Sequence, residues 1–162
     1  MQPDPRRVQR VLPLFIPSGG NARDGHWSDR NARIRSIRTA VCIVTRTMRE
    51  PWMLPPAKLH VLMVRQAPRI LDTDNLATAL KPVRDGIADG LGLPSDRSER
   101  VFWQFHQEKN KAGSLLIAIS PWVTRCFGCG HIKNDAAQWD IFDSEKQIGL
   151  CHDCSVNVLT TY

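Results

Sequence analysis

Two groups of side chains in this sequence could do chemistry: closely spaced acids near its middle and paired cysteines near its end. The acids are Asp72 and Asp74, in the segment Leu71-Asp72-Thr73-Asp74-Asn75. On an extended segment, side chains two residues apart project from the same face, close enough to share a metal ion. The pattern therefore predicts either a site for a hard cation such as Mg2+ or two unrelated surface aspartates beside a helix cap.

The acids stand in a basic part of the chain, which narrows the chemistry. The 162 residues carry a net charge of +6. Residues 1–121 hold 19 Lys and Arg side chains against 11 Asp and Glu, whereas residues 122–162 hold 3 against 5. Carboxylates in a basic domain are typical of metal-dependent enzymes that act on nucleic acid, because the carboxylates hold the cation and the basic surface holds phosphates.

Four of the five cysteines form two Cys-x-x-Cys pairs, Cys126 with Cys129 and Cys151 with Cys154. Each pair fits a tight metal knuckle, and four thiolates make a closed tetrahedral Zn2+ site. Iron, a disulfide pair or free thiols are the alternatives. A tail with few apolar side chains depends on a metal to fold, so we expect a zinc ribbon or a treble clef. Its acidic balance favours a structural cap or a contact for a partner protein over a phosphate-binding surface.

The elements that would position the acids alternate between strand and helix. Apolar runs and alternation predict strands at residues 11–16, 59–64, 100–108 and 114–119. The last two should form a hairpin. Apolar side chains at spacings of three and four predict helices at residues 31–48 and from about residue 74 to residue 91, the second kinked or restarted at Pro82. The fold class is therefore α+β, a small mixed sheet with two main helices.

Length and composition bound the organisation of the chain. We expect one domain at residues 1–121 and a small zinc-binding module with four cysteine ligands at residues 122–162. The apolar runs are too short to cross a bilayer, and the arginine-rich beginning lacks a secretory apolar core and cleavage site. We therefore expect a cytoplasmic protein with no membrane partner.

Further motifs surround the acids in a consistent order. They are Pro17-Ser18-Gly19-Gly20-Asn21, Asn21-Ala22-Arg23, His26-Trp27, Leu71 to Leu76, Lys81 to Gly86, and an acid shortly after Gly92. Together, over roughly residues 10–120, they resemble the RusA family of Holliday-junction resolvases found in bacteria and their phages. The resemblance implies a compact α+β homodimer that binds four-way DNA junctions in recombination and repair. It also implies that the homodimer uses Mg2+ to cut two strands symmetrically.

The resemblance also assigns roles to single residues. Asp72 and Asp74 match the paired aspartates, Asp96 the acid downstream of the helix, Lys81 the lysine after Asp-Asn, and Asp85 the aspartate one turn later. Three carboxylates can hold one or two Mg2+ ions at a scissile phosphate, and a nearby lysine can neutralise charge that grows on the phosphoryl oxygens. For Asp85, an ion pair with Lys81 at i, i+4 is an equal alternative.

The chain departs from the family pattern at two places. The gap from Asp74 to Lys81 is longer than in well-known members by about three residues, close to one helical turn, so Lys81 could still face the site. The family usually has adjacent aspartates where this chain has Pro94-Ser95-Asp96. Glu99 is therefore a competing candidate for the third acid.

Five basic side chains are candidates for binding the DNA backbone: Arg23, His26, Arg30, Arg33 and Arg38. For any one of the arginines, a solvated basic helix face is the alternative. Two other functions are compatible with the sequence. The protein could be a non-catalytic DNA-binding protein with a decayed acid site, as Pro94-Ser95 would indicate, or an adaptor that recruits a partner through the zinc module.

Overall fold

The computed structural model describes residues 7–18, 27–55, 57–122, 124–126, 132–133, 139–143 and 148–151. The chain forms two compact units, Met1–Pro121 and Trp122–Tyr162. The first unit is basic in its charge balance and the second is acidic.

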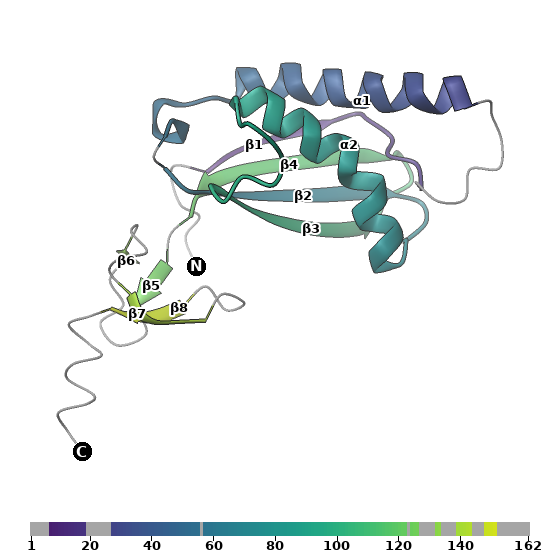
Figure 1. The fold of residues 1–162 in the computed structure, drawn as a ribbon. Helices are drawn as coiled ribbons and strands as arrows, with labels where there is room; N and C mark the ends of the chain where they lie inside the picture. The colour runs from purple at the N-terminus through teal and green to yellow at the C-terminus, as the bar shows by residue number, and fades with distance from the viewer. Residues whose placement is uncertain are drawn as a thin grey trace. The chain divides into compact units, whose positions relative to one another are not determined.

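In the first unit, a four-stranded sheet is covered on one face by two helices (Figure 1). The elements in chain order are β1 Val8–Leu12, α1 Trp27–Thr47, the short 3-10 helix η1 Pro51–Met53, β2 Leu59–Ala67, α2 Thr73–Leu91, β3 Val101–Lys109 and β4 Ser114–Pro121. The predicted α+β class, with a mixed sheet and two main helices, is confirmed. None of the helices in the described ranges has the length and apolarity needed to cross a membrane.

The strand order is β1-β4-β2-β3, so the predicted hairpin between the last two strands is wrong. β2 pairs with β3 in parallel and with β4 antiparallel, and α2 forms the crossover between β2 and β3. The burial of the two strands explains this order. Leu115, Ile117, Ala118 and Ile119 bury both faces of β4, whereas β3 exposes polar side chains at alternate positions. A strand apolar on both faces belongs inside a sheet, and a half-polar strand suits its edge.

Several element boundaries differ from the predictions, and β1 begins at Val8 and β2 continues to Ala67, each three residues beyond the predicted range. β1 ends at Leu12 instead of continuing to residue 16, because Pro13 has no amide hydrogen for the ladder. α1 begins at Trp27, four residues before the predicted start, because the exposed residues 27–30 belong to no apolar repeat. Pro82 lies inside α2 without ending it, so of the two predicted alternatives, a kink and a restart, the restart is wrong.

The core lies between the sheet and the two helices. It comprises fully buried side chains from β2, β4, α1 and α2, among them Leu59, Val61, Met63, Leu115, Ile117, Ile119, Val41, Leu80, Val83 and Ile87. The second unit has a sheet of its own in the order β6-β5-β8-β7. Its strands are β5 Thr124–Cys126, β6 Ile132–Lys133, β7 Trp139–Asp143 and β8 Ile148–Cys151.

α1 and α2 run side by side in the same direction, and glycines on α2 allow their close contact (Figure 1). A Cβ atom added at Gly86 would lie 2.6 Å from the Arg38 carbonyl oxygen, and one at Gly90 would lie 2.5 Å from the Thr45 Cβ. Contacts this short cannot accommodate a side chain. The two glycines therefore set the distance between the helices.

We predict that Gly86→Ala destabilises the protein by about 1–3 kcal/mol, because an added methyl group forces the packed helices apart. This loss should occur although alanine favours a helix over glycine by about 1 kcal/mol. Urea unfolding measures the change in the free energy of unfolding. Ala77→Gly, at an exposed position of α2, is the control that measures the effect of alanine and glycine on helix propensity alone. A Gly86→Ala protein more stable than the wild type would contradict the close contact.

Candidate functional site

Asp72 and Asp74 lie where the chain leaves β2 and enters α2. Asp72 is the N-cap of α2, with an extended backbone conformation. One carboxylate oxygen accepts a hydrogen bond from the Asn75 backbone N–H at 2.8 Å, and the other accepts one from Asn75 Nδ2 at 2.8 Å. Such a cap satisfies an amide of the first turn that has no partner within the helix. The cap explains why α2 begins here.

The same hydrogen bonds hold Asp72 in its ionised form. They lower the pKa of Asp72, the backbone N–H of Asn75 being the larger cause and the Asn75 side chain the next. An ionised carboxylate has about four lone-pair sites, so the two hydrogen bonds leave room for a cation. Asp74 lies in the first turn of α2 and is exposed.

Asp72 and Asp74 were predicted to project from the same face of an extended segment. That prediction is wrong, because the segment is not extended. The helix already includes Thr73, and residues two apart on a helix do not face each other. The reason is that Asp72 serves as the cap. Mg2+ keeps several waters and is commonly held by one or two carboxylates together with substrate phosphates, so it does not require the two side chains to share a face.

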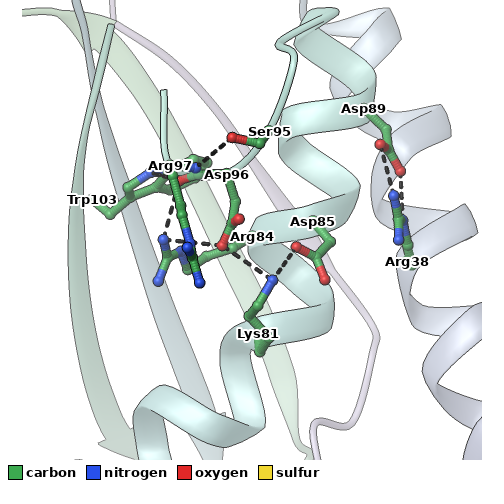
Figure 2. Close-up of polar contacts among 9 residues, drawn as sticks. All are labelled: Arg38, Lys81, Arg84, Asp85, Asp89, Ser95, Asp96, Arg97 and Trp103. Carbon is green, nitrogen blue, oxygen red and sulfur yellow. Dashed lines mark hydrogen bonds and ion pairs between the residues drawn. The ribbon is translucent and has the colours of Figure 1, made fainter. Parts of the chain in front are cut away.

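A second cluster lies further along α2 and contains Asp96, from the loop that follows the helix (Figure 2). One Asp96 carboxylate oxygen lies 3.1 Å from Lys81 Nζ and 3.1 Å from Arg84 Nη2. Lys81 Nζ also pairs with Asp85. Glu99, the competing third acid, is exposed. Of the two candidates, Asp96 is therefore the one that contacts Lys81.

The charges in this cluster perturb each other's protonation. The pKa of Lys81 is raised, mainly by its hydrogen bond to Asp85. Burial alone would raise the pKa of Asp96, but the Lys81 hydrogen bond and the positive charge of Arg84 outweigh it, so this pKa is lowered. Lys81 and Asp96 are both charged at neutral pH as a result.

The main chain of Asp96 is anchored as firmly as its side chain. The Asp96 carbonyl oxygen accepts hydrogen bonds from Trp103 Nε1 at 2.8 Å and from Arg84 Nη2 at 3.1 Å. The guanidinium of Arg84 lies over the Trp103 ring, with its Cζ 5.3 Å from the ring centroid. Sequence reasoning gave no role to Arg84. Its spacing of three residues from Lys81 on a helix was the signal that could have revealed it.

Asp74, Lys81 and Asp85 lie on one stripe of α2, because spacings of seven and four residues return to the same helix face. Lys81 is nine residues beyond the cap, about 13 Å along the axis at about 1.5 Å per residue. Within the described ranges, no group of three or more Asp, Glu, His or Cys side chains could hold a metal ion. The structure thus brings Asp96 to Lys81 and Asp85, but not to Asp72 and Asp74.

The predicted DNA-binding residues have different surroundings. Arg30 and Arg33 lie in the exposed first part of α1. Arg38 forms two hydrogen bonds with the Asp89 carboxylate, at 2.6 and 2.9 Å. α1 and α2 both begin toward the edge of the sheet where β2 ends, at the right of Figure 1. Arg23, His26, Cys129 and Cys154 lie outside the described residues, and for Cys126 and Cys151 the backbone alone is described, at the ends of β5 and β8.

Comparisons with known proteins assign no family, since no protein-family model and no curated protein matches the chain.

We predict that Asp72 makes stability depend on pH in the acid range. Its folded pKa lies below the ordinary value of 3.8, so its ionised form stabilises the folded state above that pH. This contribution is lost as the pH falls through the lowered pKa. Asparagine also caps helices but does not titrate, so the unfolding midpoint of Asp72→Asn should fall less than that of the wild type between about pH 5 and pH 2. Parallel urea midpoints for the two proteins would contradict the cap.

Proposed function

We propose that the protein is a Mg2+-dependent endonuclease that cleaves branched DNA, of the Holliday-junction resolvase type. The observation that carries this proposal is the exposed Asp72/Asp74 pair at the start of α2, on the same side of the domain as the arginine-bearing start of α1 (Figure 1). Cation ligands and phosphate-binding side chains would then lie on one side of the domain, where an extended DNA backbone could reach both. A basic surface beside carboxylates suits a phosphodiester substrate.

The local charge balance favours the start of α2 as the cation site. Lys81 and Arg84 carry two positive charges that balance the carboxylates of Asp85 and Asp96. In the described part of the chain, no ion pair neutralises Asp72 or Asp74. Two uncompensated carboxylates attract a divalent cation, whereas a neutral cluster does not.

Each group then has a distinct task. Asp72 and Asp74 would hold Mg2+, which supplies Lewis-acid polarisation of a phosphate and a lowered pKa of bound water. Lys81 lies about 13 Å along α2 from the cap, at about 1.5 Å per residue, so it would pair with a neighbouring phosphate of the DNA backbone and not with the one that Mg2+ polarises. Asp85 and Asp96 orient the Lys81 ammonium group, and Asp96 could ligate a cation only after its ion pairs with Lys81 and Arg84 open.

The DNA would be held mainly through its backbone. Arg30 and Arg33 on the exposed part of α1 can pair with phosphates, which positions a duplex without reading its sequence. Symmetric cleavage of two strands requires two copies of the site, and a homodimer would supply them.

A non-catalytic DNA-binding protein is the second candidate function. The observation that favours it is the separation of Asp96 from the acid pair, which leaves no three-acid group among the described residues. A synthetic four-way junction distinguishes the two candidates. Symmetric nicks in Mg2+ support the enzyme, and a gel shift without nicks supports the binding protein.

We predict that Asp74→Asn lowers junction cleavage by about 1,000-fold while junction binding without Mg2+ stays unchanged. The change removes a negative charge that binds the cation. Each increase of about 1.4 kcal/mol in the activation free energy lowers the rate tenfold. Glu108→Gln is the matched control, an acid-to-amide change at an exposed position of β3. Equal losses of binding and cleavage in Asp74→Asn would contradict the assignment.

We also propose that the second unit binds one structural Zn2+ through Cys126, Cys129, Cys151 and Cys154. β5 and β8, which end at Cys126 and Cys151, are parallel neighbours, so the backbone brings one cysteine of each pair into adjacent strands. Four thiolates fit the tetrahedral preference of Zn2+.

Elemental analysis of the purified protein should give one Zn2+ per chain. Cys126→Ser and Cys151→Ser should each lose it, because three thiolates no longer close the site. Cys42→Ser is the matched control, since Cys42 is a free cysteine on α1 and should not affect the metal. Zinc retained by Cys151→Ser would contradict the four-cysteine site.

A further inference from the structure

The residue before Asp72 is held by a side chain from the neighbouring edge strand. Gln107 of β3 accepts a hydrogen bond on Oε1 from the Leu71 N–H at 2.9 Å, and its Nε2 donates to the Leu71 carbonyl oxygen at 2.6 Å. Both backbone polar groups of Leu71 are thus paired with one side-chain amide. We propose that Gln107 is a positioning residue that sets Asp72 and Asp74 for cation binding, a role that rests on the proposed nuclease function.

The turn needs such support because it lies beyond the end of the sheet. The β2–β3 ladder ends at the pair Ala67 and Lys109, followed by one hydrogen bond from the Asn110 N–H to the Ala67 carbonyl oxygen. Residues 68–72 therefore leave the ladder and must pair with side chains. Gln107 lies two residues before the end of β3, within reach of the returning chain.

A second side chain ties the same turn from β2. Arg65 is 3% exposed, and its Nη1 donates to the Arg69 carbonyl oxygen at 2.8 Å while its Nε donates to the Ile16 carbonyl oxygen at 2.9 Å. Arg65 and Gln107 are opposite each other in the parallel register. Adjacent side chains of two strands thus fix the turn at Arg69 and at Leu71, immediately before the acids.

Few other side chains could replace Gln107. A single planar amide offers one acceptor and donors together, as a peptide group does. Glutamate keeps the acceptor but has no donor when ionised, asparagine is one methylene shorter, and methionine has neither group in useful strength. The role of Gln107 therefore depends on its chemistry as well as its size.

Fixing Leu71 fixes the cap that follows it. The Leu76 N–H donates to the Asp72 carbonyl oxygen at 2.9 Å, and the Asp72 carboxylate holds Asn75, so the direction of both acids follows from where Asp72 is placed. Residues that orient the ligands of a metal ion commonly contribute about 10- to 100-fold to metal affinity or activity. A shift of about 1 Å at a reacting group can cost about 100-fold in rate.

The test compares Gln107→Met and Gln107→Glu with the control Gln104→Met. Gln104 lies on the same strand but on its other face, where Oε1 bonds His60 Nε2 at 2.8 Å. Three quantities are measured in the full-length protein: hydrogen exchange of the Leu71 amide, Mn2+ affinity by electron paramagnetic resonance, and the Mg2+ dependence of junction cleavage. Exchange and Mn2+ binding do not depend on catalysis.

We expect Gln107→Met to speed Leu71 exchange and to weaken Mn2+ binding by about 10-fold. Its cleavage should fall by about 10- to 100-fold and require more Mg2+. Gln107→Glu keeps the Leu71 N–H bond, so its Leu71 amide should exchange slowly while two oxygens now oppose each other. Gln104→Met should match the wild type in all three measurements. If Gln107→Met does not fold, Gln107→Glu provides the metal and cleavage comparison.

Unchanged Leu71 exchange in Gln107→Met would overturn the contact itself. Faster exchange with wild-type Mn2+ affinity and cleavage would overturn the positioning role and leave the nuclease proposal standing. A wild-type protein that neither binds Mn2+ nor cuts junctions would overturn the proposed function, and the role of Gln107 with it.

Discussion

The parallel pairing of β2 with β3 is the constraint on which the candidate site depends. Two parallel neighbours end at the same edge of a sheet, so the chain must return along α2 and enter β3 from the opposite edge. β3 therefore lies beside both the segment that leads from β2 into α2 and the loop that leads from α2 into β3. Near its start, Trp103 holds the Asp96 carbonyl oxygen, and near its end Gln107 holds Leu71. One edge strand thus fixes the acids at both ends of the crossover.

Charged groups at the site serve the fold as well as the proposed chemistry. Asp72 begins α2 as its cap, and Asp96 joins the loop after α2 to Lys81 and Arg84. Because helix caps and ion pairs satisfy these groups without a ligand, the acids can be fixed before any cation binds. Such preorganisation reduces the cost of ordering ligands on binding. It also couples stability to the charge state that the proposed reaction needs.

Local patterns were sufficient for the fold class but not for the strand order. The alternation in β2 and the helical period of α2 predicted both elements, and the i, i+4 spacing predicted the contact between Lys81 and Asp85. The hairpin was predicted from the short loop between β3 and β4. The apolar side chains on both faces of β4 indicate instead a strand inside the sheet. The contact between Gln107 and Leu71 spans 36 residues, and no local pattern encodes it. The prediction that Asp72 and Asp74 share a face was wrong because Asp72 caps α2, so the chain is already helical at Thr73.

The packing of α1 on α2 divides the arginines of α1 into one that joins the helices and others that lie on the exposed part of α1. Gly86 and Gly90 let the helices touch, and the Arg38–Asp89 pair joins them on the exposed side, so Arg38 contributes to the helix contact. The first buried residue of α1 is Ile37, which leaves residues 27–36 exposed over about 15 Å at about 1.5 Å per residue. Because the packed half fixes the direction of the exposed half, Arg30 and Arg33 keep a constant position relative to the start of α2. Their proposed contribution to phosphate binding would thus depend on an apolar contact that begins one to two turns away, at Ile37.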